Sequence, residues 1–361
     1  MVESDPTPVD ISVIIPAYGR TERLRVLVAQ LLDQELEGER VEIVVVDDGS
    51  PEPVEPALTD LPSIAGISLR VVRRDNGGPA VARNFGAAAA RGELLLFIDD
   101  DLSVPRDLVR QHRLVQQECG PALVNCALEW RIEAESEPFA RWYRNRTGEW
   151  GRSRNDNGRA VAEGVLEITA PMASTANLSI PRRDFEYLGG FDEGYPYGCE
   201  DQDFAGRADR LGLPILFCTR TTAVHVETHD TLRKLCRRQQ LGARDTVRFL
   251  KRFAVEHHVG RPDIARTNDP LAWSSDGFGL GSKKILRRIL TLPIVSGAAF
   301  GFIRIGEAVA PRSKILARGY DLLVGAYAQK GWREGLQLYR GVEPLSEWNP
   351  ANDQPIPGPA K

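Results

Sequence analysis

Several kinds of residue are scarce in this chain of 361 residues, and each scarcity excludes a class of protein. There are five cysteines and no CxxC pair, which argues against a disulfide framework and against a zinc knuckle. An odd, small number of cysteines is typical of a reducing compartment. The net charge is only −4, so no excess of positive charge points to nucleic acid as a partner.

Long hydrophobic runs are also missing. The longest weakly polar stretch covers residues 289–303 and contains a proline and two glycines. As a helix it would be about 22 Å long, which is shorter than the ~30 Å hydrocarbon core of a bilayer. The acidic, proline-containing segment at residues 1–10 does not resemble a signal peptide. We therefore expect a cytoplasmic protein, with peripheral contact to the inner face of the membrane as an alternative.

What the chain does contain is an alternation of apolar runs and amphipathic segments. The runs at residues 10–20, 41–50, 69–78 and 93–101 predict four strands, and residues 21–34 and 79–92 predict helices between them. Apolar strands that alternate with helices indicate an α/β fold, in which helices cover both faces of a mostly parallel sheet.

Beyond residue 105 the pattern is looser. The charged, glycine-containing segment 146–164 predicts a mobile loop, and residues 213–226 predict a pair of strands. We expect one domain over residues 1–230, divided into halves at 10–105 and 106–230. A helical region is expected at 231–341, followed by a proline-rich tail at 342–361.

Polar side chains follow each of the four predicted strands, at residues 18–20, 47–50, 76–78 and 99–101. The carboxyl ends of parallel strands meet at one edge of a sheet, and ligands bind in the crevice beyond that edge. These four strand ends therefore predict a single cleft.

Three adjacent carboxylates, Asp99, Asp100 and Asp101, directly follow one apolar run. They repel one another, and a protein core does not tolerate unpaired charges. The run therefore ends either in a solvated turn or at a bound cation. Carboxylates two residues apart can converge on a hard divalent cation such as Mn²⁺ or Mg²⁺. For this pattern alone the solvated turn is favoured, because aspartate is a common turn residue.

A second acidic group, formed by Glu200, Asp201 and Asp203, lies at the start of a predicted helix. Carboxylates at a helix N-terminus are stabilised by the helix dipole, so ordinary capping explains them equally well. The alternative is a catalytic role for one of them.

Taken together, five segments of the chain resemble family 2 nucleotide-sugar glycosyltransferases. They are VIIPAYGR, VVVDDGS, NGGPAVARNFG, LLFIDDD and GGFDEGYPYGCEDQDFAGRADRLG, and they occur in the order typical of that family. The resemblance covers residues from about 10 to 226. It implies a GT-A type, Rossmann-like sheet with a helical C-terminal extension. It also implies that residues 10–105 bind the nucleotide sugar and the metal, while residues 106–230 form the acceptor half.

The resemblance also implies roles for individual residues. Asp48 would accept a hydrogen bond from a uracil ring, and Arg83 would face the diphosphate. Asp201 matches the catalytic base, with Glu200 beside it. Nucleotide-sugar binding is implied for Pro16, Ala17, Tyr18, Arg20, Asp48, Asn76, Gly77, Arg83, Asp99 and Asp100. Metal binding is implied for Asp99 and Asp101, and His225 is weighed as a third ligand against an ordinary half-buried histidine.

The function implied is that of a metal-dependent, inverting glycosyltransferase with a nucleoside-diphosphate sugar, expected to be a UDP-sugar, as donor. A glycan, a lipid-linked molecule or a small molecule would each fit as acceptor. One alternative is a non-catalytic, nucleotide-sugar-binding scaffold subunit, against which the intact Glu200–Asp201 pair argues. The other is a nucleotidyltransferase, which would need a phosphate loop rich in glycine and lysine after the first strand.

Two basic groups in the C-terminal region share one spacing. Solvated helix faces explain such groups, and contact with anionic lipid headgroups is the alternative. The region after residue 280 is also a candidate homodimer interface. The residues are Arg233, Lys234, Arg237 and Arg238 in the first group, and Lys283, Lys284, Arg287 and Arg288 in the second.

Overall fold

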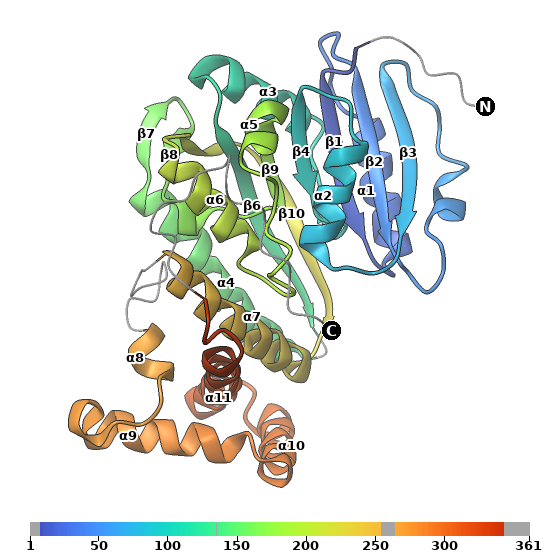
Figure 1. Ribbon diagram of the computed structural model, residues 1–361. Helices are drawn as coiled ribbons and strands as arrows, with labels where there is room; N and C mark the ends of the chain where they lie inside the picture. Colours follow the sequence, from blue (N-terminus) through green and yellow to red (C-terminus); the bar gives the residue numbers. More distant parts are fainter. Residues whose placement is uncertain (1–7, 135, 254–263, 343–361) are drawn as a thin grey trace.

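In the computed structural model, which describes residues 8–134, 136–253 and 264–342, a mixed sheet of ten strands forms the centre of the molecule (Figure 1). The strand order is β3-β2-β1-β4-β9-β6-β10-β8-β7, and β5 pairs with β10. The strands are β1 (Ile11–Ala17), β2 (Val41–Asp48), β3 (Ile67–Arg74), β4 (Leu94–Ile98), β5 (Leu102–Ser103), β6 (Leu123–Ala134), β7 (Arg159–Ala162), β8 (Val165–Glu167), β9 (Asn177–Pro181) and β10 (Ile215–Asp230).

The central strands of this sheet are mostly parallel, as predicted. β3, β2, β1 and β4 run in parallel, and so do β6 and β10. β9 is antiparallel to both of its neighbours, β4 and β6. The order reverses between β1 and β4, because the chain first moves outward to β3 and then returns to the other side of β1. Such a switch point leaves a crevice at the carboxyl ends of the strands.

Helices cover both faces of the sheet. On one face, Val13 and Ile15 of β1 pack in the same core as α1 (Thr21–Leu32) and α3 (Leu108–Cys119). On the other face, Ile14 packs in the same core as α2 (Pro79–Ala89), α5 (Arg182–Tyr187) and α6 (Glu200–Arg210). Figure 1 shows α2 on the near side of the sheet. Burial on both faces explains why these strands are continuously apolar.

The prediction of a mobile loop at 146–164 is wrong. Helix α4 (Glu137–Asn157) extends to residue 157, and β7 follows at once. The start signals of this helix are clear in hindsight: Ser136 is the N-cap, its hydroxyl accepts from the N–H of Phe139, and Pro138 occupies the first turn.

The strand pair predicted at 213–226 is also wrong, because residues 215–226 lie in the single strand β10. Its pairing with β6 shifts register between Cys218 and Thr222. Such an irregularity bends a strand without ending it. Two short 3-10 helices, η1 (Glu55–Leu58) and η2 (Ala170–Met172), complete this part of the chain.

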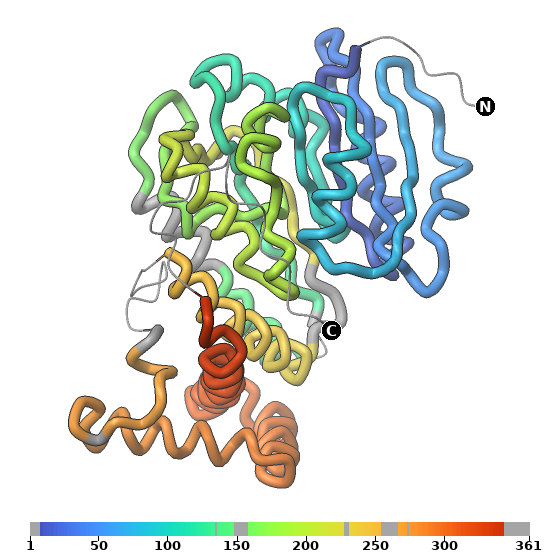
Figure 2. The backbone as a smooth tube through the Cα atoms, viewed as in Figure 1, coloured from blue at the N-terminus to red at the C-terminus, as the bar shows by residue number. Residues whose placement is uncertain are grey.

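The C-terminal region is helical, as predicted. It contains α7 (Leu232–Phe253), α8 (Ile264–Asn268), α9 (Trp273–Leu290), α10 (Pro293–Val309) and α11 (Lys314–Leu338). α7 and α11 lie side by side, and α4 joins them through a core that includes Phe139, Leu235 and Tyr320. Figure 2 shows α9 and α10 at the end of the molecule farthest from β3. The predicted proline-rich tail lies, apart from Val342, outside the described residues.

A cluster of buried ion pairs ties α7 to the segment that leads into α6. Asp192 accepts hydrogen bonds from Arg248, at 2.8 Å, and from Arg252, both on α7. Asp203 of α6 accepts from Arg207 at 2.8 Å and forms an ion pair with Arg252 at 3.2 Å. We call these five residues the α6–α7 ion cluster. It fixes the position of the N-terminus of α6 relative to the C-terminal helices.

Candidate active site

A cleft of about 540 Å³ lies at the carboxyl ends of β1, β2 and β4. This is the crevice expected at the switch point of the sheet. All the predicted nucleotide-sugar residues except Gly77 line it, together with Asp101, Glu200 and His225, whereas Asp201 lies outside the lining. The lining residues are Pro16, Ala17, Tyr18, Arg20, Asp48, Asn76, Gly78, Pro79, Ala82, Arg83, Asp99, Asp100, Asp101, Pro196, Tyr197, Gly198, Glu200, His225 and Arg238.

Strand pairing brings His225 to the three aspartates. The two-residue strand β5, which directly follows Asp101, pairs antiparallel with β10, so that Leu102 lies opposite His225. The N–H of Val226 also donates to the carbonyl oxygen of Asp101 at 3.0 Å. As a result, Nε2 of His225 lies 3.2 Å from Oδ1 of Asp101. The Trp130 ring stacks on the imidazole at 4.2 Å and fixes its plane.

Asp99, Asp101 and His225 form a group that could hold a divalent metal ion. Their potential ligand atoms lie within 4.8 Å of one another, a distance that no other such trio reaches among the described residues. Two carboxylates and an imidazole suit Mn²⁺, and the carboxylates alone suit Mg²⁺. The buried Nδ1 of His225 has no hydrogen-bond partner in the described part of the chain.

Arg83 on α2 connects the aspartate turn with the start of α6. Its buried guanidinium donates to Asp99 at 2.7 Å and to Glu200 at 2.9 Å. Burial disfavours the charged form, but the charges of Asp99 and Glu200 outweigh this effect and raise the pKa of Arg83. The residue therefore stays a cation and holds two acidic side chains at fixed positions in the cleft.

Arg20, in the loop that follows β1, likewise holds two acidic side chains. It donates to Asp100 at 2.8 Å and also pairs with Asp101. Burial raises the pKa of Asp100 to about 7; Arg20 opposes this rise, while Asp101 and Asp99 add to it. The raised pKa of Asp100 therefore reflects mainly its burial, with the repulsion of Asp101 and Asp99 as a smaller contribution.

The cleft therefore carries more acid than base. We call Asp99, Asp100, Asp101, Glu200, Arg20 and Arg83, together with Asp201 next to Glu200 outside the lining, the cleft cluster. Arg238 also lines the cleft, but it donates to Tyr143 and is not counted in the cluster. The cluster contains five carboxylates and two guanidiniums. An excess of buried negative charge is costly unless a cation neutralises it, so the composition of the cluster fits a bound divalent metal.

Asp48 has a structural contact that the sequence did not reveal. Its carboxylate accepts hydrogen bonds from the N–H groups of Gly77, at 3.0 Å, and Gly78, at 2.8 Å. The loop approaches so closely that a Cβ on Gly49, which has φ +75°, would lie 2.6 Å from the nitrogen of Asn76. Asp48 thus joins β2 to the loop before α2, and its contact with a nucleobase stays a prediction.

The start of α6 is backbone-strained. Cys199, which precedes Glu200, has φ 70°, the left-handed region that a residue with a Cβ adopts at a cost of about 1–3 kcal/mol. Such strain is found most often at functional sites. Glu200 faces Arg83, whereas Asp201 is half-buried beside it. Burial and the charge of Glu200 raise the pKa of Asp201 above its usual range, although Arg83 opposes them.

Sequence reasoning missed Ala82 and a further group of cleft residues, which are Pro196, Tyr197, Gly198 and Arg238. Ala82 is on α2, next to Arg83. Pro196, Tyr197 and Gly198 belong to the turn before α6. They lie within a segment that carries the family resemblance, but the resemblance gave them no role of their own. Arg238 was assigned to a basic helix face, but it is half-buried and donates to the hydroxyl of Tyr143 at 2.6 Å. Arg237 next to it is exposed. Adjacent residues on a helix point about 100° apart, so only one of the two could share the solvated face.

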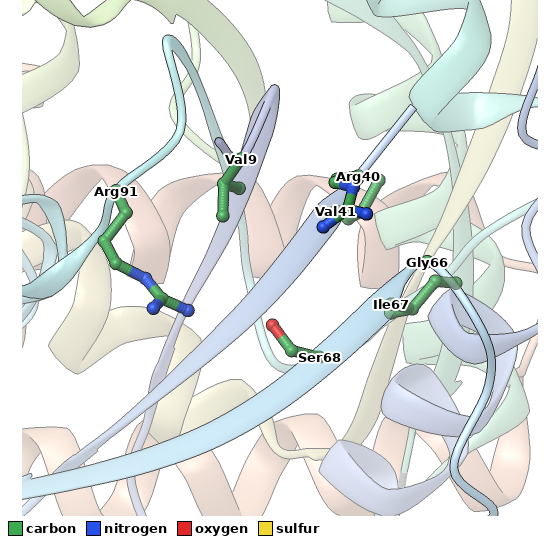
Figure 3. Close-up of a pocket in the computed structure, with 7 residues that line it drawn as sticks. All are labelled: Val9, Arg40, Val41, Gly66, Ile67, Ser68 and Arg91. Atoms are coloured by element: carbon green, nitrogen blue, oxygen red, sulfur yellow. The ribbon is translucent and has the colours of Figure 1, made fainter. Parts of the chain in front are cut away.

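A second hollow, of about 280 Å³, lies at the opposite edge of the sheet, where β2 and β3 begin (Figure 3). Its lining has basic side chains, Arg40 and Arg91, but no acidic one and none of the predicted site residues. It therefore lacks the ligands for a metal and the groups for acid–base chemistry.

Part of the chain matches a known protein family. Residues 12–165 match the sequence profile of the family described as glycosyl transferase family 2. This segment, which is less than half of the chain, is similar to that family. It contains residues 12–105 of the predicted nucleotide-sugar half and ends before α6.

Two relatives show how far the similarity extends. The chain is 29% identical to the glycosyltransferase YfnE of Bacillus subtilis, over 60% of this chain and 64% of that protein. It is 31% identical to a pre-mycofactocin glycosyltransferase of Mycobacterium tuberculosis, over 59% of this chain and 42% of that protein. The chain thus spans less than two thirds of the length of either relative.

Among solved structures, the chain is similar to a mannosyltransferase, PcManGT, from Pyrobaculum calidifontis in complex with GDP-Man and Mn²⁺. The TM-score is 0.51 at 18% identity, and the match covers 91% of this chain and 89% of that one. At this identity the likeness shows the fold alone. The predicted GT-A type fold, with its helical C-terminal extension, is confirmed.

Proposed function

We propose that the protein is a metal-dependent, inverting glycosyltransferase that uses a nucleoside-diphosphate sugar, with a UDP-sugar as the expected donor. The observation that carries the proposal is the convergence of Asp99, Asp101 and His225 in a cleft that also contains Arg83 and Glu200. The names of the relatives support the enzyme class.

Asp99, Asp101 and His225 would hold the metal ion, which supplies positive charge for the diphosphate leaving group. Arg83 and Arg20 keep the aspartate turn in place through the hydrogen bonds described above. The loop that Asp48 ties down closes the nucleotide side of the cleft.

Asp201 is the proposed general base, and its raised pKa suits proton abstraction near neutral pH. It takes the proton from an acceptor hydroxyl, whose oxygen attacks the anomeric carbon of the donor sugar. The new C–O bond forms as the bond to the diphosphate oxygen breaks, and a single displacement inverts this carbon. Glu200 is held by Arg83 and positions the start of α6.

The test combines nucleotide binding with transfer. Thermal stability is measured against UDP, GDP, dTDP and CDP, each with and without Mn²⁺, and a shift that needs both nucleotide and metal is expected. Transfer from the matching sugar nucleotide is then compared in D201N. Removing a general base is expected to lower kcat about 10²–10⁴-fold, with an unchanged nucleotide-dependent shift.

The matched control is D209N, which alters an exposed aspartate on the same helix. It is expected to retain full activity. Undiminished transfer by D201N would refute the assignment of the base. If no nucleotide shifted the melting temperature with or without metal, the proposed donor class would be wrong.

A further inference from the structure

Large apolar side chains are exposed along α10, at the end of the molecule farthest from β3 (Figure 2). Ile294 is 89% exposed, Phe302 is 73% exposed and Val309 is 78% exposed, and Ile305 lies between the last two. The spacing i, i+8, i+11, i+15 places these four side chains on one face of the helix. The opposite face packs on the protein, because Phe300 is buried in the core shared with α4, α7 and α11.

Helix α9, which precedes α10 in the chain, also exposes apolar side chains. Phe278 and Ile289 are exposed, and they lie eleven residues apart on one side of the helix. We call Phe278, Ile289, Ile294, Phe302, Ile305 and Val309 the apolar ridge. Large apolar side chains that are exposed in such numbers on two neighbouring helices of a folded chain point to an interaction site.

The lengths of α9 and α10 and the angle between them bear on how they could meet a membrane. Among the described residues no single helix is long and apolar enough to cross a bilayer. Helices α9 and α10 have the length and apolar composition of a span only when taken together, as a pair bent by 97°. Two helices at about a right angle can, however, lie together in one plane. That arrangement suits helices that rest in the interface of a membrane.

The charge around the ridge is positive. Residues 278–318 contain eight lysines and arginines and one acidic residue, Glu307. Glu307 accepts hydrogen bonds from the hydroxyls of Ser136, at 2.8 Å, and Tyr320, at 2.6 Å. Lys284 of the predicted lipid-contacting group is buried in an ion pair with Asp276, which corrects that prediction for one residue. Exposed cations remain at Lys283, Arg288, Arg304, Arg312, Lys314 and Arg318.

We infer that the apolar ridge docks on a membrane surface that carries anionic lipids. The apolar side chains would enter the acyl boundary, and the surrounding cations would meet the lipid phosphates. A second copy of the chain fits less well. A two-fold contact would bring the same face of each copy together, and here that means cation against cation.

The experiment is flotation of the full chain with vesicles of phosphatidylcholine alone and of phosphatidylcholine mixed with phosphatidylglycerol. We expect binding only to the anionic vesicles, weakened by raised salt. The triple variant I294S/F302S/V309S is expected to bind at least tenfold more weakly, and so is the charge variant K283E/R288E/K314E. The controls are V26S and R183E, which change exposed residues on α1 and α5.

Circular dichroism and thermal melting show whether the variants fold, since every altered side chain is exposed. Equal binding of the wild type and the two multiple variants would overturn the inference, and so would binding that ignores anionic lipid. A wild-type dimer in light scattering that becomes a monomer in I294S/F302S/V309S, with no vesicle binding, would instead identify the ridge as an interface between copies. The vesicle assay contains no sugar nucleotide, so its failure leaves the proposed function untouched.

Discussion

Two buried clusters of charge meet at α6, and they differ in what balances them. In the α6–α7 ion cluster, two carboxylates face three arginines, and some of the other arginine donors reach backbone carbonyls such as those of Gly190 and Gly194. In the cleft cluster, five carboxylates share two arginines. The protein's own groups balance the first cluster, because backbone carbonyls accept from the arginines that exceed its carboxylates, whereas the second keeps an excess of negative charge that a bound cation has to neutralise. The balance of charge, rather than burial, therefore separates a structural cluster from a functional one.

The largest expected effect is the loss of one acid from the balanced cluster. D192N removes the charge that Arg248 and Arg252 share. Uncompensated buried charge costs about 3–5 kcal/mol, and we expect this decrease in the free energy of unfolding, measured with urea. E186Q, at an exposed carboxylate on α5, is the control and should change stability little. A loss below about 1 kcal/mol for D192N would contradict a structural role for the cluster.

His112 is a buried group that belongs to neither cluster. Its protonation therefore tests how acid affects the stability of the fold, apart from any effect of acid on the site. Nε2 of His112 lies 2.8 Å from Oδ1 of Asn177, and burial lowers the pKa of His112 to about 4. The unfolded chain, with a histidine pKa near 6.5, binds the proton more tightly, so stability is lost as pH falls from about 6.5 to 4. This amounts to about 3 kcal/mol.

The measurement is urea unfolding of the wild type and H112Q between pH 4 and pH 7. The difference between the two proteins isolates the histidine, because every other titrating group is common to both. We expect the wild type to lose its advantage over H112Q as the pH falls. A difference that does not change with pH would show that His112 is not held neutral in the fold.

A moderate effect is expected where the C-terminal helices reach the cleft. R238M removes the cation that α7 contributes to the cleft lining. A charge-assisted hydrogen bond to a substrate anion is worth about 1.5–3 kcal/mol, so kcat/KM should fall at least tenfold. R237M, at the exposed neighbour, is the control. Equal activities of the two variants would mean that Arg238 only packs against Tyr143.

The smallest expected effect is that of D100N on the free energy of unfolding, and its sign is opposite to that of D192N. This variant tests the difference between the two clusters most directly. D100N removes one buried carboxylate that Asp99 and Asp101 repel. Without metal, we expect it to stabilise the protein by about 1 kcal/mol, measured by urea unfolding in a chelator. The stabilisation that Mn²⁺ gives the wild type should be smaller in this variant. Destabilisation by D100N in chelator would mean that Arg20 already balances the cleft.

Much of the nucleotide-sugar half could be predicted because its information is local. Each strand there is a continuous apolar run, and each polar strand end directly follows its strand, as Asp99 to Asp101 follow β4. The switch point then gathers these ends, since parallel strands end at one edge. Residues that follow β1 and the last residue of β2 line the same cleft for the same reason.

The rest depends on contacts between residues far apart in the chain, which no local pattern records. His225 meets Asp101 only because β5 pairs with β10, and Arg83 meets Glu200 only because α2 and α6 cover the same face of the sheet. The side of α7 that carries Arg238 was equally undetermined. An amphipathic pattern shows that one face of a helix is buried but not what it is buried against.

The sequence by itself determined the fold class, the order of the family motifs and the residue types available for the cleft, because periodicity and strand-end chemistry are properties of short segments. Only the tertiary structure decided which acids share which arginines and which apolar helix face stays exposed among the described residues. Charge balance and burial depend on which residues lie close together in the folded chain, and distant segments come together only there.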